Sequence, residues 1–503
     1  MPESLASFDQ LKARLDDVQN ITSAVALLGW DQQTYMPEHG AATRGDQMAT
    51  LERIAHEMFT TPAMGQLFEQ SAVELASADD ASDDASLVRV AKRDYDLKTR
   101  VPASLIAELA HTTSLAHTDW IKARAENNYA LFAPWLEKII ALKRQEADHI
   151  GYAENRYDAL LNQYEYGTST AEVTAIFDAL KKDVVPLVTR IVEQKERAND
   201  SVLRRFYDVK KQNDFSARVA HDFGYDFQRG RQDVAVHPFC EGMSRDDVRI
   251  TTRFDPRFLQ VALFGVLHET GHALYEQGVG ADLPHYLASG TSLGVHESQS
   301  RLWENVVGRS RGFWKHYFPQ IQDVFPESLS DVDVETFYRA VNTSAPSFIR
   351  VEADEVTYSL HIMLRFEMEQ ELLSGTLGVA DAPAAWNEKF KSYLGITPPT
   401  DTLGILQDVH WSIGLVGYFP TYALGSMLAA QLYEKAAHDV PSIPADIEHG
   451  QFASLLGWLR TNIHAHGRKF TPKELVQRAL GEPLNARPYV QYLTSKYGDI
   501  YGF

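Results

Sequence analysis

Two histidines and a glutamate in residues 266–274 have the spacing of a metal-dependent hydrolytic site. His268 and His272 are four residues apart, and Glu269 lies between them. On an α-helix, residues four apart share a face, so both imidazoles can bind one divalent cation such as Zn²⁺. Glu269 lies about 100° around the helix from His268, where it can accept a proton from the attacking water instead of binding the ion. The pattern therefore predicts a zinc-dependent peptidase with Glu269 as general base.

The third protein ligand that a catalytic zinc ion usually needs must come from outside this motif. The extended pattern H-E-x-x-H-x-x-G-x-x-H would continue with glycine and then histidine, but the chain has Tyr275 and Gly278 in those places. A second predicted helix, residues 291–308, carries Glu297, and we expect this carboxylate to be the third ligand. The competing candidates are His296, Glu304 and Glu276.

The elements that must position these residues can be predicted from the surrounding sequence. Asp255 followed by Pro256 is typical of a helix N-terminus, and Gly278 stands where a helix end favours glycine. We therefore expect a helix over 256–277 that is mostly apolar before the histidines and is buried. Residues 247–254 alternate β-branched and polar side chains, which predicts a strand just before this helix.

Helical periodicity dominates the rest of the chain. Helices are expected at 5–28, 40–58, 85–112, 131–150, 170–198, 350–373, 423–437 and 450–463, with hydrophilic loops at 77–86 and 198–213. We predict a mainly α protein: two helical lobes around a deep active-site cleft, with a small β-sheet beside the metal site. Because no long flexible linker divides the chain, residues 1–503 are expected to form a single peptidase domain with its catalytic motifs between 237 and 422.

Composition limits the partners. Lys and Arg number 48 and Asp and Glu number 68, a net charge of −20, so we expect no nucleic-acid partner and no anionic membrane. Cys240 is the single cysteine, which rules out an intramolecular disulfide and favours a reducing cytoplasm. The first residues lack the basic start and apolar run of a signal peptide. Residues 411–433 carry no formal charge, but Pro420 and three glycines favour a buried wall of the active site over a membrane span.

Several further motifs occur in an order that is specific to one family. They are HPF at 237–239, DVRIT at 247–251, HETGH at 268–272, HESQ at 296–299, IRVEAD at 349–354 and GILQDVHW at 404–411. With these segments the chain resembles the carboxypeptidase Taq family of metallocarboxypeptidases over nearly its whole length. The resemblance implies a fold related to neurolysin and angiotensin-converting enzyme. It also implies a cytoplasmic homodimer that releases single residues from the C-termini of peptides.

The resemblance also singles out residues that would contact the substrate. A free C-terminal carboxylate suits the planar fork of an arginine, and Arg249 and Arg350 lie in the family motifs. For Arg350, the alternative is a local ion pair with Asp354, four residues on. The developing oxyanion needs a hydrogen-bond donor, for which we choose His410 and Tyr418, with Tyr422 next. Asp408 is expected to orient His410 or a metal-binding histidine.

Other functions remain open from the residues alone. A zinc oligo-endopeptidase would share the metal-binding residues without needing a free C-terminus, and a helical binding protein could retain a structural zinc. An aminopeptidase is disfavoured, because its G-x-M-E-N recognition sequence is absent. We expect one Zn²⁺ per chain, although a site of two histidines and a glutamate also binds Co²⁺ or Mn²⁺.

Overall fold

The segment that carries both histidines folds as a buried helix, α10 (Leu259–Gly278), in the computed structural model, which describes residues 6–503. Its N-terminus differs from the prediction. Asp255 is not the N-cap, because its carboxylate accepts a hydrogen bond from the amide of Arg257, 2.7 Å away, and closes a separate turn. The helix therefore begins three residues later than expected, after Phe258, and keeps its predicted end.

A small sheet lies against α10. Its strands are β1 (Gln232–Val234), β2 (Cys240–Ser244) and β3 (Asp247–Thr252), in the order β1-β3-β2. The central strand, β3, pairs in parallel with β1 and antiparallel with β2. It is the strand that the alternating pattern predicts, although it is two residues shorter. Because β3 leads directly into α10, the sheet fixes the position of the helix that carries the histidines.

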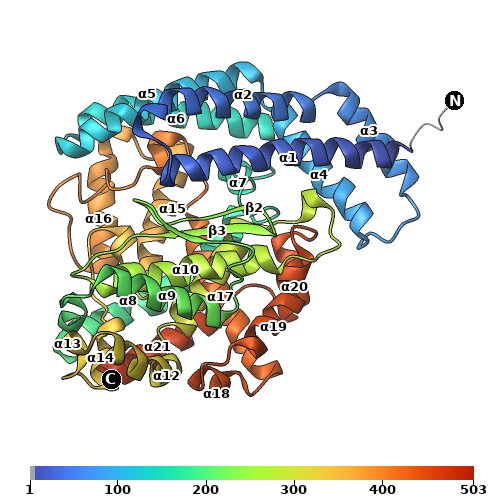
Figure 1. The fold of residues 1–503 in the computed structure, drawn as a ribbon. Helices are drawn as coiled ribbons and strands as arrows, with labels where there is room; N and C mark the ends of the chain where they lie inside the picture. The colour runs from blue at the N-terminus through green and yellow to red at the C-terminus, as the bar shows by residue number, and fades with distance from the viewer. Residues whose placement is uncertain (1–5) are drawn as a thin grey trace.

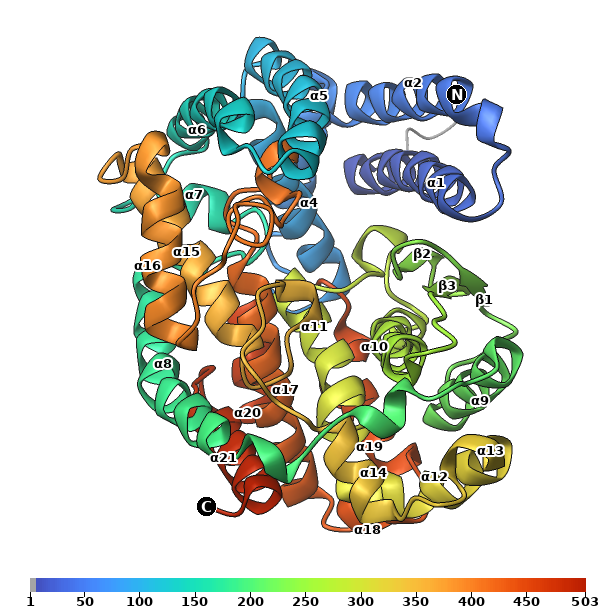
Figure 2. The same ribbon diagram turned by 90° about the vertical axis from the view of Figure 1, so that its left-hand side faces the viewer.

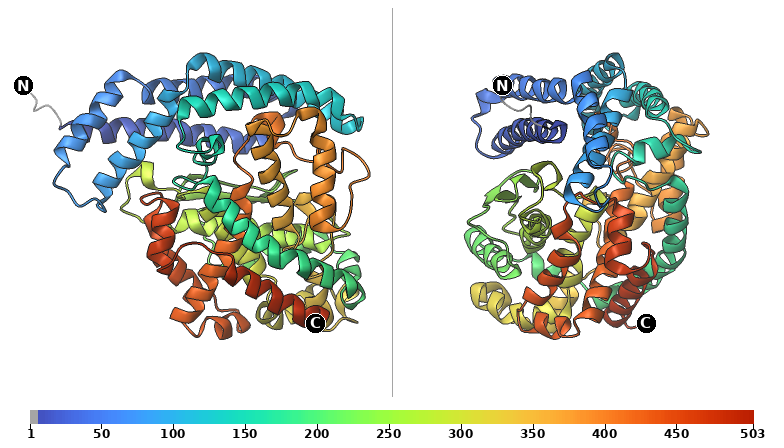
Figure 3. Two further views of the ribbon diagram at one scale, coloured as in Figure 1. Left: turned by 180° about the vertical axis from the view of Figure 1, so that it is seen from behind. Right: turned by 90° about the vertical axis from the view of Figure 1, so that its right-hand side faces the viewer.

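The N-terminal helices lie along one side of the molecule, above the sheet in the view of Figure 1 and again in Figure 3. They are α1 (Ser7–Thr34), α2 (Ala41–Phe59), α3 (Pro62–Glu74), α4 (Asp83–Arg100), α5 (Ala103–Ala125) and α6 (Tyr129–Ile150). The single helix predicted over 85–112 is wrong, since the chain breaks at Pro102. Proline has no amide hydrogen and disfavours a helical conformation in the residue before it.

The remaining helices form the body of the molecule (Figure 2). They are α7 (Arg156–Leu161), α8 (Thr170–Glu193), α9 (Val209–Phe223), α11 (Leu293–Arg301), α12 (Arg311–Val324), α13 (Pro326–Leu329), α14 (Val334–Val341), α15 (Tyr358–Ser374), α16 (Ala382–Leu394), α17 (Pro420–Asp439), α18 (Ile443–Glu448), α19 (Ala453–Asn462), α20 (Pro472–Leu480) and α21 (Arg487–Tyr501). The predicted mainly α fold with a small sheet is confirmed. Within residues 6–503 no helix is both long and apolar enough to cross a membrane.

Three local predictions fail for identifiable reasons. The helix predicted over 350–373 starts only at Tyr358, because the carboxylate of Asp354 accepts hydrogen bonds from the amides of residues 356 and 357 and shapes a turn. The loop predicted over 198–213 is shorter, because Asp208 caps α9. The loop predicted over 77–86 likewise ends early, where Ser82 caps α4. The prediction that no signal peptide is present rests largely on residues 1–5, which lie outside the described residues. The first residue of the helix predicted over 5–28 also lies outside them.

The buried hydrophobic side chains of residues 6–503 form two cores. The larger one begins at Ala116 of α5 and includes the buried faces of α6 to α21. A smaller one joins helices α1 to α4 and contacts the body through Tyr286 and Leu287. The division between the cores therefore falls close to the break at Pro102.

Helix α11 is held between α10 and α17 at backbone contact distance. A Cβ on Gly271 of α10 would lie 2.5 Å from the carbonyl oxygen of Gln299. A Cβ on Gly425 of α17 would lie 2.6 Å from the Cβ of Glu297. Only glycine permits both approaches, so these two residues set how closely Glu297 can come to the histidines.

Replacing Gly271 with alanine should separate α10 from α11. We expect the free energy of unfolding to fall by about 1–3 kcal/mol, because the obstructing atoms belong to the backbone and cannot rotate away. Thermal and denaturant unfolding would measure this. Gly265→Ala on the same helix is the matched control: its Cβ would meet Thr252 at an ordinary 3.5 Å, and alanine favours the helix by up to about 1 kcal/mol. Equal losses in both variants would contradict the close-packing explanation.

Candidate metal centre and active site

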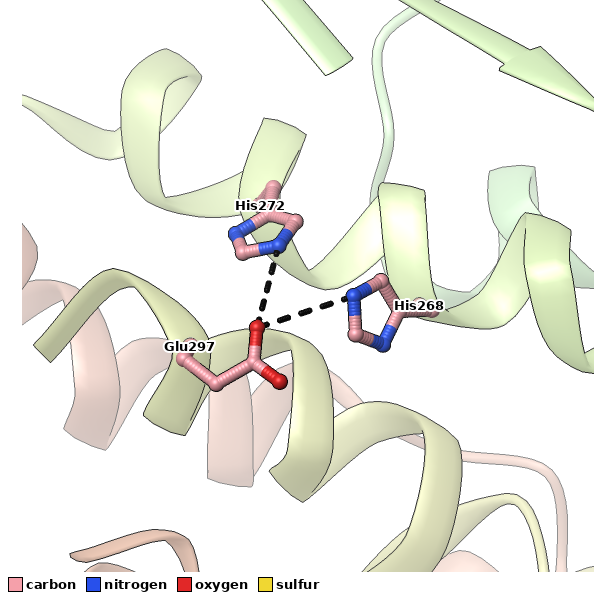
Figure 4. Close-up of side chains that lie close together, drawn as sticks. All are labelled: His268, His272 and Glu297. Carbon is pink, nitrogen blue, oxygen red and sulfur yellow. Dashed lines mark ion pairs between the residues drawn. The ribbon is translucent and has the colours of Figure 1, made fainter. Parts of the chain in front are cut away.

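Three side chains from two helices converge on one point. The Oε2 atom of Glu297 lies 3.7 Å from the Nε2 atom of His268 and 3.7 Å from that of His272 (Figure 4). The three donor atoms all lie within 4.8 Å of one another. Ligand atoms that each lie about 2.0–2.2 Å from one ion are themselves roughly 3–4 Å apart, so this group fits a divalent cation. The structure thus brings together the three residues that the sequence selects.

The Nδ1 atom of each histidine contacts a neighbouring side chain: a glutamate for His268, and a second histidine that is itself paired with a glutamate for His272. Nδ1 of His268 lies 2.9 Å from the carboxylate of Glu304. Nδ1 of His272 lies 2.7 Å from Nδ1 of His296, whose Nε2 lies 2.7 Å from Glu276. The competing candidates for the third ligand therefore all lie behind the histidines. There they fix the ring orientation and leave both Nε2 atoms facing Glu297.

Arg301 orients the carboxylate of Glu297. Its Nε donates a hydrogen bond of 2.6 Å to Oε1 of Glu297, and its Nη1 lies 3.4 Å from Glu304. The guanidinium stacks on the ring of Tyr358 at 4.3 Å. Oε1 is thus turned toward Arg301, while Oε2, which also accepts a hydrogen bond of 3.2 Å from the hydroxyl of Ser300, faces the histidines. Burial and the hydrogen bond from His268 act in opposite directions on Glu304, and the net effect lowers its pKa to about 2.

Glu269 is buried beside this group, with 6% of its surface exposed. Burial raises its pKa to about 7, while the neighbouring His268 acts in the opposite direction. A divalent cation held by the adjacent residues would favour the ionised form further. The side chain is therefore placed to exchange a proton near neutral pH.

A second cluster surrounds His410, which lies in the short helix η8 (His410–Ile413). The rings of Tyr418 and Tyr422 lie 5.5 Å and 6.3 Å from its imidazole, and 5.3 Å from each other. Burial raises the pKa of Tyr418, and the charge of Glu297 adds to this rise. Burial lowers the pKa of His410 to about 4. These groups are thus neutral hydrogen-bond donors at neutral pH.

Arg350 belongs to the same cluster and does not pair with Asp354. Its Nε donates to Asp408 over 2.8 Å, its Nη1 lies 3.1 Å from the hydroxyl of Tyr358, and its guanidinium lies 5.1 Å from the ring of Tyr422. The local ion pair is excluded because the carboxylate of Asp354 instead accepts bonds from the hydroxyls of residues 344 and 357 and from nearby amides.

Asp408 has a different role from the one expected. Its carboxylate lies 3.9 Å from Nδ1 of His410, too far for a hydrogen bond. It lies between two arginines instead, accepting from Arg350 and from the fully buried Arg365. Both guanidinium groups hold its pKa well below the usual range against the effect of burial. Asp408 therefore orients Arg350.

Arg249 occupies a different environment on β3. It forms a two-pronged ion pair with Asp247, with both distances 2.8 Å, and its guanidinium lies 4.3 Å from the ring of Trp30 in α1. The side chain is partly exposed. In the described part of the chain, its contacts thus join the sheet to α1, and it does not share the cluster around Arg350.

Comparison with known proteins identifies the family. The family model described as carboxypeptidase Taq (M32) metallopeptidase matches residues 10–497. The chain belongs to this family. It is 39% identical over 496 residues to carboxypeptidase 1 of Bacillus subtilis, covering 98% of each chain. It is 41% identical to thermostable carboxypeptidase 1 of Thermus thermophilus, covering 99% of each. The crystal structure of an M32 carboxypeptidase from Deinococcus radiodurans superposes with a TM-score of 0.95 at 41% identity, covering 99% of this chain and 100% of that one.

The family membership predicted from the motifs is confirmed, and with it a metal-dependent peptide hydrolase of the carboxypeptidase class. Two charged residues of the site were nevertheless missed. Arg301 stands four residues after Glu297, a spacing that predicts a contact on one helix face. Arg365 stands within an apolar helical run, and a charge in a buried position requires a partner. Both signals are present in the sequence, but neither identifies the long-range partners.

Removing the charge of Glu304 should weaken metal binding in this M32 protein. We expect Glu304→Gln to lower the affinity about 10- to 100-fold, because His268 loses the charged acceptor that orients its ring and makes it a stronger ligand. Competition with a chromophoric chelator would measure the affinity. Glu335→Gln is the control, since this carboxylate pairs with Arg339 at 2.8 Å on the surface. An unchanged affinity in the Glu304 variant would show that the ring needs no such support.

Proposed function

We propose that the protein releases single residues from peptide C-termini, with one divalent cation held by His268, His272 and Glu297. The observation that carries this proposal is the convergence of these three donors beside Glu269. A cation bound there supplies Lewis-acid activation of water and of the peptide carbonyl. Residues 1–503 are proposed to act as one peptidase domain.

Glu269 is the proposed general base. Its carboxylate accepts a proton from the attacking water and returns it to the leaving amine. Its burial supports this role, because a low-dielectric site raises the pKa of a carboxyl group toward neutrality. The arrangement of a base beside two histidines would have no use in a purely structural site.

Arg350 is the favoured partner of the substrate's terminal carboxylate. Its Nε is occupied by Asp408 and its Nη1 by Tyr358, while Nη2 makes no hydrogen bond within residues 6–503. His410 and Tyr418 are proposed as donors to the developing oxyanion, and Tyr422 as a substrate contact beside Arg350. Arg249, on β3 beside Trp30 of α1, is a second proposed substrate-binding residue.

Three further properties are part of the proposal: the metal, the oligomeric state and the location. The metal is proposed to be Zn²⁺, since two imidazoles and a carboxylate suit this ion, although Co²⁺ and Mn²⁺ fit the same ligands. Homodimerisation rests on the family resemblance. A cytoplasmic location rests on that resemblance and on the single cysteine, Cys240.

Timed mass spectrometry of a model peptide tests the activity directly. Products that shorten one residue at a time from the C-terminus are expected, and a chelator should abolish them. The same peptide with an amidated C-terminus should be cleaved far more slowly, because the arginine fork loses its partner. Equal cleavage of both peptides at internal bonds would instead favour an oligo-endopeptidase.

The variant Glu269→Gln separates metal binding from proton transfer. We expect it to keep the metal, measured by elemental analysis, because the amide is not a ligand. Its kcat should fall by about 10²- to 10⁴-fold, the usual contribution of a general base. Near-wild-type hydrolysis by the metal-loaded variant would rule out the proposed mechanism.

Replacing the two arginines separately should show which one binds the terminal carboxylate. Arg350→Ala is expected to lower kcat/KM for free-acid peptides by roughly 10- to 100-fold, the value of a charged hydrogen bond. The amidated peptide should lose much less. Arg249→Ala is the matched variant and should show a smaller difference between the two peptides. If Arg350→Ala affects acid and amide equally, the lost contact is not the terminal one.

A further inference from the structure

The segment 410–418 carries two of the proposed substrate contacts and has an irregular path. After η8 the backbone takes left-handed conformations at Gly414 and Gly417, with φ of 78° and 90°. Its internal hydrogen bonds lie in the first half, from the amide of Leu415 to the carbonyl of His410 and from Gly414 to Trp411. A short irregular loop of this kind keeps one shape only where outside contacts hold it. The precise placing of His410 and Tyr418 thus depends on neighbouring elements.

One buried carboxylate holds both ends of this segment. Glu369 of α15 is fully buried. Its Oε1 accepts a hydrogen bond of 2.9 Å from the indole of Trp411, the residue after His410. Its Oε2 accepts one of 3.0 Å from the amide of Gly417, the residue before Tyr418, and one of 2.7 Å from the hydroxyl of Tyr157.

Helix α7 supports the same segment from behind. It supplies Tyr157, which orients Glu369, and its backbone lies directly against Gly417. A Cβ on Gly417 would come within 2.7 Å of the carbonyl carbon of Leu160. Beyond α7, Tyr164 packs edge-on against the ring of Tyr418 with centroids 5.3 Å apart. The loop is therefore fixed on one side by sterics and on the other by Glu369.

We infer that Glu369 is a positioning residue for the peptidase reaction, acting through Trp411 and Gly417 to hold His410 and Tyr418 at the substrate. This inference rests on the proposed function. Glu369 belongs to none of the sequence motifs and does not contact the metal-binding residues. A carboxylate suits the task because three donors require two accepting oxygens. A glutamine could accept at one position only and would turn its NH₂ group toward a donor at the other.

The variant Glu369→Gln keeps the size of the side chain and removes one acceptor. We expect kcat to fall by about 10- to 100-fold, as for a misplacement of roughly 1 Å in a catalytic group. The metal content should stay at the wild-type level. Tyr157→Phe removes a single donor and should give a smaller loss of the same kind, so a result remains available if the glutamine variant folds poorly.

Glu367→Gln is the matched control. Glu367 lies on the same helix and also accepts from a tyrosine, Tyr393 at 2.6 Å, but its other partners are Lys181 and Lys389 on the surface side. It has no contact with the segment 410–418. This variant should lose some thermal stability while kcat stays at the wild-type value.

Double-mutant cycles distinguish positioning from a general structural effect. If Glu369 acts through the segment, Glu369→Gln should cost far less in a Tyr418→Phe or His410→Ala background than in the wild type. The inference is overturned if Glu369→Gln keeps wild-type kcat, or if its full loss recurs in both backgrounds. Failure of the proposed function would look different, because the wild-type enzyme itself would then release no C-terminal residues from the model peptide.

Discussion

The close approach of three helices is the constraint on which the site depends. Two glycines, one in α10 and one in α17, allow α11 to approach closely on both sides, so the carboxylate of Glu297 lies within 3.7 Å of both histidines. The ligand positions are set by backbone packing, and the rings are then oriented by their outer hydrogen bonds. Such a site is organised before an ion arrives, which lowers the entropy that binding must overcome.

The charges divide the site into two halves of opposite sign. Around the histidines, carboxylates outnumber the arginines that contact them, and a divalent cation would balance this excess. In the other half, a single carboxylate, Asp408, lies between Arg350 and Arg365. Burying a charge costs free energy unless an opposite charge is nearby. Here two arginines share one carboxylate, so one positive charge is left unbalanced. A peptide with a free C-terminus carries the complementary charge, whereas an internal segment does not.

Local signals in the sequence predicted most helices and strands. They failed where an aspartate carboxylate can accept hydrogen bonds either from the amides of a helix N-terminus or from those of a separate turn. The helix that carries both histidines, the preceding strand and the second helix are predicted from the sequence. The structure shortens the first of these helices at its start and adds a π-helical turn (Leu302–Val307) after α11. Asp255 was predicted to cap a helix and Asp354 fell inside a predicted helix, but both carboxylates accept hydrogen bonds from nearby amides and close turns. The break at Pro102 was predictable, since proline seldom continues a helix.

The site residues likewise fall into two groups: those that a local pattern selects and those whose partners are distant in the sequence. Two histidines four residues apart are a local pattern, so the sequence alone selects them as candidate metal ligands. Arg350 shows the opposite case: the local rule pairs it with Asp354, whereas the fold supplies Asp408 from 58 residues away and leaves Asp354 to shape a turn. A sequence shows that a buried charge needs a partner but not which distant residue provides it, because that choice depends on how the helices pack. The long-range partners Arg365 and Glu369 could therefore be found only in three dimensions.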